Sequence, residues 1–198
     1  MRTIYVTLRF AMSTAPALGR PRDTSLDAAI LRATVDLLGE VGYAELTMTA
    51  VAARAGTTKP ALYRRWPSKA HLVHEAVFPP QEQPLWPDGA DLAASVRLML
   101  TGAVALFSEP TVRAALPGLL SEFATHPSLH SALLERFQSD VWDRMRSRLA
   151  EEGVGVDADV LVDLVAGAAF MAVTLRSAPV DDTWVDRTVD LLLKGIQP

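Results

Sequence analysis

Residues 47–69 read TMTAVAARAGTTKPALYRRWPSK, and this stretch decides the fold. One short helix is predicted from the residue after Thr47, a good N-cap, to Gly56, which suits the turn after a helix. A second short helix is predicted to begin after Thr58 and to end near Trp66. A supporting helix, a tight glycine turn and a short second helix make a helix-turn-helix, whose second helix enters the major groove of DNA. The stretch therefore predicts a DNA-binding unit.

Two flanking helices complete this unit. Upstream, Asp23-Thr24-Ser25 offers three good N-cap residues, and Gly42 suits the end of the helix that follows. Apolar residues at steps of three and four predict one buried stripe on this helix: Leu26, Ile30, Ala33, Leu37 and Val41. Downstream, the helix that begins at Ser68 is predicted to turn four residues inward: Leu72, Val73, Ala76 and Val77.

The rest of the chain is also predicted to be helical. Four prolines within residues 79–87 stop any helix there and indicate a domain boundary. Five further helices are expected to begin near Asp91, Pro110, Pro127, Asp157 and Asp181. The sequence has no alternation typical of strands, no internal repeat and no glycine-rich phosphate loop. We therefore expect an all-α protein, with an N-terminal three-helix helix-turn-helix domain and a C-terminal helical domain.

Composition excludes several classes of protein. Of the 198 residues 49% are apolar and 21% charged, which is typical of a globular chain. The absence of cysteine excludes disulfide-stapled modules, thiolate zinc sites and cysteine nucleophiles. The longest uncharged apolar run, residues 164–175, is shorter than the ~17–25 residues that span a bilayer. We expect a soluble protein of the bacterial cytoplasm, with no membrane partner.

The net charge of −4 is divided unequally along the chain. Residues 20–74 hold eight Lys or Arg against five Asp or Glu, whereas residues 75–198 hold nine against eighteen. A basic N-terminal segment followed by an acidic C-terminal segment is expected when only the N-terminal segment binds nucleic acid. Residues 1–19 add two arginines and no acid. We prefer to interpret them as a disordered extension from an upstream start codon, with Met12 as the true start; a transit peptide is the alternative.

The residues around the predicted helix-turn-helix resemble the signature of TetR-type transcriptional regulators. The resemblance extends over residues 42–72 and is carried by Gly42-Tyr43, Thr47, Val51-Ala52, residues 55–69 and Leu72. The acidic remainder, from His126-Pro127-Ser-Leu129 to residues 189–195, also resembles a TetR-like C-terminal domain, although His126 stands where an acidic N-cap is usual. The resemblance implies a homodimer that binds DNA and a small effector. The implied division of the chain is a flexible basic extension (1–22), a DNA-binding domain (23–78), a proline-rich linker (79–90) and an effector-binding and dimerisation domain (91–198).

Ten residues of the motif are candidate DNA contacts: Thr47, Thr57, Thr58, Lys59, Pro60, Ala61, Tyr63, Arg64, Arg65 and Lys69. The hydroxyl groups and cations among them can bind phosphate oxygens. Arg64 can also bind a guanine edge, and Pro60 and Ala61 can contact a thymine methyl. Lys69 opens a helix whose dipole favours an anion. The arm residues Arg20 and Arg22 are candidates for the minor groove. Leu62 and Trp66 are expected in the core.

Ordinary interpretations of the same residues stay open. Tyr63 can be a half-buried helix residue, and Arg64 and Arg65 a solvated charged pair. Lys59 can be a simple surface residue, and the arm arginines can serve solubility alone.

Two C-terminal helices predict self-association. Residues 160–175 are apolar nearly all round, interrupted only by Asp163, Gly167 and Thr174. Both sides of this helix are therefore expected to pack against other helices, one side in its own domain and the other in a partner subunit. The last helix carries a stripe of Val185, Val189, Leu192 and Ile196, with Asp186, Arg187 and Asp190 outside it. Two such helices from each subunit would form a four-helix interface about a two-fold axis.

An effector pocket is predicted from aromatic and methionine residues of the middle helices: Met99, Phe107, Phe123, Trp142, Met145 and Phe170. Polar anchors would come from Thr101, Ser121, His126 or Thr174, and core packing is the alternative role for the apolar set. The effector is expected to be small and largely apolar. Its identity does not follow from the sequence.

Enzyme chemistry has little support. His71 and His74, and His126 and His130, have helical spacing, but no HExxH motif accompanies either pair. We find no nucleophile elbow, and we expect no metal, no cofactor and no catalytic residue. The main hypothesis is a ligand-released repressor on a palindromic operator. Alternatives are the same fold without an effector, an activator that contacts other proteins, and a helical enzyme or scaffold without DNA affinity.

Overall fold

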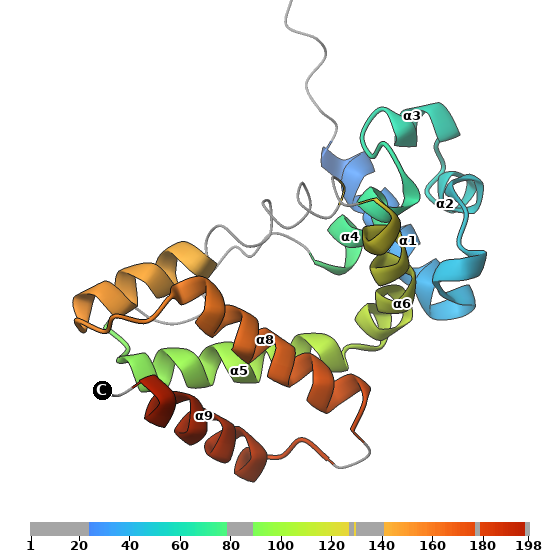
Figure 1. Ribbon diagram of the computed structural model, residues 1–198. Helices are drawn as coiled ribbons and strands as arrows, with labels where there is room; N and C mark the ends of the chain where they lie inside the picture. The colour runs from blue at the N-terminus through green and yellow to red at the C-terminus, as the bar shows by residue number, and fades with distance from the viewer. Residues whose placement is uncertain (1–23, 79–88, 127–128, 130–140, 177–178, 197–198) are drawn as a thin grey trace, which may run out of the picture.

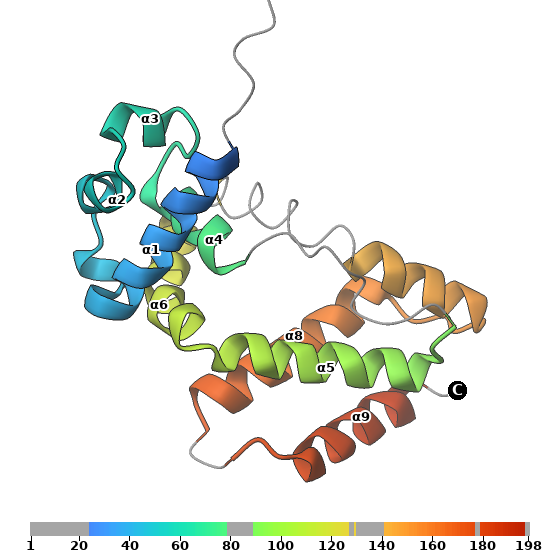
Figure 2. The same ribbon diagram turned by 180° about the vertical axis from the view of Figure 1, so that it is seen from behind.

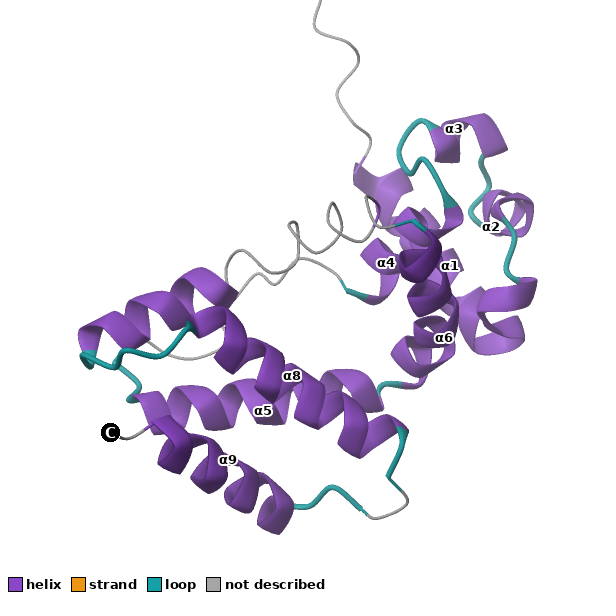
Figure 3. Cartoon of the chain, in the orientation of Figure 1, coloured by secondary structure: helices purple, strands orange, loops and turns teal. Residues whose placement is uncertain are grey.

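The computed structural model describes residues 24–78, 89–126, 129, 141–176 and 179–196. All regular structure in these ranges is helical, and they contain no strand (Figure 3). The helices are α1 (Thr24–Glu45), α2 (Met48–Arg54), α3 (Lys59–Tyr63), α4 (Lys69–Val77), α5 (Leu92–Ser108), α6 (Pro110–Thr125), α8 (Ala158–Thr174) and α9 (Asp182–Ile196). Residues 141–151 are helical as well. The all-α prediction is confirmed.

Local capping explains where the first helices begin. The hydroxyl oxygens of Thr47, Thr58 and Ser68 accept hydrogen bonds from backbone N–H groups in the first turns of α2, α3 and α4. Gly42 interrupts α1 with a φ of +72°, in the left-handed region that favours glycine. The chain then makes one more helical turn before α2. The predicted caps of α2, α3 and α4 and the predicted end of the first helix at Gly42 are therefore confirmed. Asp23, predicted to cap α1, lies outside the described residues.

The first core is shared by α1, α2, α3, α4 and α6. Ile30, Leu62 and Leu72 are fully buried in it, and so is Leu119 from α6. Figures 1 and 2 show α6 lying against α1 and α4, although these helices precede the proline-rich segment and α6 follows it. The break between the two cores thus falls at the turn from α5 to α6.

The second core is formed by α5, residues 141–151, α8 and α9. Leu100, Met145, Leu161 and Val165 are almost completely buried in it. Figures 1 and 2 show α8 crossing α5 on one face and α9 lying alongside α5 below it. The backbone N–H of Leu92 donates to the Glu152 carboxylate at 2.6 Å, which joins the start of α5 to the segment before α8.

Helices α5 and α6 meet at an angle of 85°. Within the ranges described above, no single helix is long and apolar enough to cross a membrane. The bent pair of α5 and α6 meets that criterion only when its two halves are counted together, by length and composition alone.

Three details of the predicted helices differ from the structure. Val41 is 46% exposed, and Tyr43, beyond the break, is buried at this end of α1. Periodicity indicates which face of a helix turns inward, but not how far the neighbouring helices extend along it. Ala76 is only half-buried. Helix α3 ends at Tyr63, and turn hydrogen bonds to the Leu62 carbonyl continue the chain to a buried Trp66.

Candidate nucleic-acid interface

Helix α3 has one buried side and one exposed side. Leu62 is fully buried and Ala61 is 8% exposed, so both belong to the side that packs on the domain. Thr58, Lys59 and Pro60 are exposed. Ala61, which the sequence offered as a contact for a thymine methyl, therefore lies on the inner side. Figure 1 shows α3 at an outer corner of the molecule.

Three side chains dominate the exposed side of α3 and its end. The Lys59 ammonium lies 5.7 Å from the centroid of the Tyr63 ring, within the range of a cation–π contact. Tyr63 is 44% exposed, and Arg64 is exposed with no partner among the residues that the structure describes. A cation, a phenol hydroxyl and a guanidinium on one face match the donors that bind phosphate and base edges.

Two other predicted contacts are engaged inside the domain. The Arg65 side chain forms an ion pair with Asp27 of α1, and its Nη1 donates to the Ala61 carbonyl at 3.2 Å. The Lys69 ammonium donates to the Tyr43 carbonyl at 2.9 Å and lies 4.3 Å from the centroid of the Tyr43 ring. Sequence spacing does not reveal these partners, because they lie 38 and 26 residues away.

The threonines of the motif cap α2 and α3 and stabilise the turn between them. Thr47 is exposed and its Oγ1 accepts from the Ala50 N–H at 3.1 Å. Thr57 is half-buried, and its own N–H donates to the Ala52 carbonyl at 2.9 Å. Gly56 has a φ of +66°, which provides the left-handed turn. Of the three threonines predicted to contact DNA, Thr47 and Thr58 are exposed and Thr57 is half-buried.

Polar contacts between helices fix the frame around α3. The indole N–H of Trp66 donates to Glu75 of α4 at 3.0 Å, so this buried ring has a partner for its polar atom. On the surface, Arg54 of α2 binds both carboxylate oxygens of Glu40 of α1 at 2.8 Å. The hydrogen bonds from Arg54 hold the pKa of the Glu40 carboxyl below its usual range.

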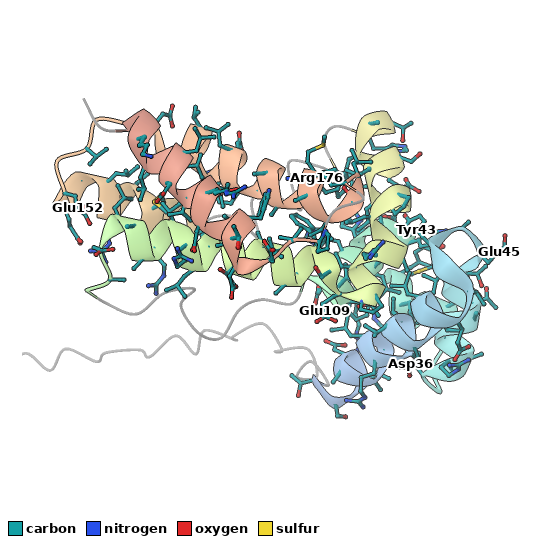
Figure 4. The ribbon with its side chains drawn as sticks, turned by 90° about the horizontal axis from the view of Figure 1, so that it is seen from below. Asp36, Tyr43, Glu45, Glu109, Glu152 and Arg176 are labelled. Carbon is teal, nitrogen blue, oxygen red and sulfur yellow. The ribbon has the colours of Figure 1, made fainter. Side chains whose placement is uncertain are left out.

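Tyr43 joins the DNA-binding motif to α6. Its ring packs onto Gly118 of α6, and its hydroxyl donates to the Glu122 carboxylate at 3.5 Å. Figure 4 shows Tyr43 where the end of α1 meets α6. Burial raises the pKa of the Tyr43 hydroxyl, and the nearby Glu122 carboxylate adds to the shift. Sequence reasoning did not assign Gly118 or Glu122 a role; the Pro117-Gly118 pair inside a helix is the signal that marks this position.

The six predicted pocket residues do not form one group. Met145 and Met99 are buried in the second core, and Trp142 packs against it. Phe107 and Phe170 form an edge-to-face pair with centroids 5.6 Å apart, and Phe107 packs against both cores. Phe123 packs against the first core instead.

An apolar stripe is exposed on α8. Val160, Leu164 and Met171 are each about half exposed, at 52%, 54% and 51%, and Gly167 stands between them. Their steps of three and four place them on one face of the helix. Leu175 and, on α9, Leu191 are exposed at 67% and 73%. Val185 and Val189 turn into the second core, and Leu192 packs beside them.

Several predicted residues lie outside the described ranges. These are the extension with Met12, the arm residues Arg20 and Arg22, the prolines of residues 79–87, His130, the start of the helix expected near Pro127, and the side chain of Ile196. Across the ranges that are described, no group of three or more His, Asp or Glu side chains is arranged to hold a metal ion.

Two family models match most of the chain. The model for bacterial regulatory proteins of the tetR family matches residues 30–76. The model for the tetracyclin repressor-like C-terminal domain matches residues 86–192. The first match contains the whole of α2, α3 and the turn between them, and the second contains α5, α6 and α8.

Individual proteins agree with these models over most of their length. A DNA-binding transcriptional repressor TetR from Mycobacteroides abscessus is 30% identical, over 89% of this chain and 97% of that protein. The HTH-type transcriptional regulator YdeS of Bacillus subtilis is 28% identical, over 90% and 93%. The crystal structure of the TetR family transcription regulator SCO0332 is similar with a TM-score of 0.65 at 28% identity, over 88% of this chain and all of that one.

Proposed function

This chain belongs to the TetR family of bacterial DNA-binding transcriptional regulators, and we propose that it is a repressor that binds a near-palindromic operator as a homodimer and is released by a small, largely apolar effector. The repressor among its relatives, at 30% identity, supports the direction of regulation.

The outer face of α3 is the observation that carries the proposal. Lys59, Tyr63 and Arg64 lie on this face with no partner of opposite charge among the described residues. A short helix with such a face suits the major groove of one half-site. The proposed contacts are Thr47, Thr58, Lys59, Pro60, Tyr63 and Arg64.

A second copy of the chain would cover the apolar stripe of α8. An exposed apolar stripe of this kind is unusual on a monomer. Its place on α8, with Leu191 exposed on α9, supports the predicted four-helix interface. A two-fold axis through this interface would place two α3 helices on successive half-sites.

The effector is proposed to bind beside the Phe107–Phe170 pair. Phe107 packs against both cores, so a ligand that displaced it would act on α6 and on α8 together. Release from DNA then requires the ligand to bind one arrangement of the two cores more tightly than the other, by typically ~1–3 kcal/mol.

Fluorescence-anisotropy titration of a labelled DNA fragment tests the function. The probe is the fragment upstream of the chain's own gene, an unrelated fragment is the control, and two salt concentrations are used. We expect the upstream fragment to bind at least ~10³-fold more tightly than the control. Equal weak binding to both calls for a genome-wide binding selection, and a selection that enriches no sequence would refute the proposal.

A further inference from the structure

We propose that Arg65 is a positioning residue, which with Asp27 fixes the orientation of α3, and that it does not contact DNA. The proposal rests on the proposed DNA-binding function. It concerns the one arginine of the motif that the sequence does not distinguish from its neighbour, Arg64.

The geometry of Arg65 directs it toward α1. Asp27 lies in the first turn of α1, and Arg65 follows directly after the C-cap of α3, so their ion pair joins the end of one helix to the start of the other. A second donor of the same guanidinium binds the Ala61 carbonyl within α3. Arg65 is thus attached at once to its own helix and to α1.

Burial distinguishes this pair from an ordinary surface pair. The Arg65 and Asp27 side chains are 11% and 22% exposed, whereas those of Arg54 and Glu40 are 41% and 52% exposed. Water therefore screens the Arg65–Asp27 attraction less. The neighbouring Arg64 is exposed and has no partner in the described part of the chain.

Contact between Arg65 and DNA would carry an electrostatic penalty. The guanidinium would have to give up its ion pair with Asp27, which is largely shielded from water. Arg64 can reach DNA without any such exchange. The two adjacent arginines therefore have different roles. Arg64 binds the nucleic acid, and Arg65 fixes the orientation of α3, which carries Arg64 at its end.

The test is a set of DNA-binding titrations with the full chain over a range of salt concentrations. The probes are the fragment identified by the titration or selection above and a mixed-sequence duplex. Arg65→Ala, Asp27→Ala, the double variant and the exchanged pair Asp27→Arg with Arg65→Asp are compared, with Arg64→Ala as the matched control. Circular dichroism at the assay temperature selects variants that are folded.

A positioning role predicts a distinctive pattern. Arg65→Ala and Asp27→Ala each weaken binding to the selected fragment about fivefold, the upper end for an ion pair near the surface. The double variant is no worse than either single variant, since both remove the same interaction. The log–log salt slope stays unchanged, whereas Arg64→Ala lowers it by about 0.9 where Arg64 binds phosphate. The exchanged pair recovers part of the loss.

Other outcomes overturn the inference. If Arg65→Ala lowers the salt slope by about 0.9 while Asp27→Ala leaves binding unchanged or tighter, Arg65 is a phosphate contact. If the wild-type chain selects no DNA sequence at all, the proposed function fails and this inference fails with it. If the wild-type chain binds its selected fragment and Arg65→Ala and Asp27→Ala bind it equally well, the positioning role is refuted and the proposed function stands.

Discussion

The phenol ring of Tyr43 occupies the space that a side chain at position 118 would need. A β-carbon built on Gly118 would lie 1.9 Å from Cδ1 of Tyr43, far closer than two carbon atoms can approach. The helix-turn-helix and α6 therefore fit together only because residue 118 is glycine. The same tyrosine holds Lys69 through its carbonyl and its ring, so one residue joins α1, α4 and α6.

Gly118→Ala should destabilise the protein, because either Tyr43 or α6 must shift to accept the methyl group. Overpacking of this kind costs about 1–3 kcal/mol, which is measurable by thermal or urea denaturation. Gly39→Ala is the matched control, since nothing lies within 4 Å of the β-carbon there and the residue is exposed within α1. It should stabilise by about 0.5–1 kcal/mol through helix propensity. Equal effects of the two substitutions would contradict the close fit.

Tyr43→Phe should make stability less sensitive to alkaline pH. Burial raises the folded-state pKa of Tyr43 above its unfolded value near 10, so the neutral hydroxyl stabilises the fold below that value. This contribution is lost as pH rises above about 10, where the unfolded chain releases the proton first, by at most about 1.4 kcal/mol per pH unit. Denaturation midpoints measured between pH 8 and 11 should thus fall more steeply for wild type than for Tyr43→Phe. Tyr63→Phe, at an exposed position, should follow wild type.

Arg64→Ala should weaken operator binding without lowering the melting temperature. The side chain is exposed and has no partner in the described residues, so its loss removes DNA contacts and no internal ones. The expected loss is about 1–3 kcal/mol if it binds a base edge, measured by anisotropy. Arg113→Ala, an exposed arginine of α6, should bind as wild type does. A parallel drop in melting temperature for Arg64→Ala would mean that the residue supports the fold.

Leu164→Glu should convert the proposed dimer into a monomer. Leu164 is 54% exposed at the centre of the α8 stripe, and a buried charge at a two-fold interface lacks a partner. Light scattering should give about twice 21.4 kDa for wild type and 21.4 kDa for the variant. Leu120→Glu, at a residue of α6 that is 47% exposed, should remain dimeric. A wild-type mass of 21.4 kDa would refute the proposed assembly.

Local signals were enough to predict the helices of the DNA-binding motif. Thr47, Thr58 and Ser68 bind backbone groups three residues onward, and Gly42 and Gly56 adopt the left-handed conformations that their positions suggest. Each of these features depends on a few neighbouring residues. Capping rules apply directly to such short spans.

Long-range partners were beyond prediction from the sequence. Arg64 and Arg65 are identical neighbours, yet Arg65 has Asp27 as its partner 38 residues away, and only the packing of α3 on α1 brings that carboxylate close. In the same way, Tyr43 meets Glu122 at a separation of 79 residues. Phe123 looked like a pocket residue by type, but its helix packs it on the first core. Residue type indicates what a side chain can do, and the tertiary fold decides which partner it finds.

The place of α6 in the first core limits how this protein can be divided. A fragment cut in the proline-rich segment would lose Val112, Ala115 and Leu119 and would leave the apolar surfaces of α1 and α4 facing water. A longer fragment that kept α6 would also carry α5, whose buried residues belong to the other core. Because the two cores are interleaved along the chain, we expect neither half to fold on its own. A DNA-binding domain moved to another protein should therefore keep α6.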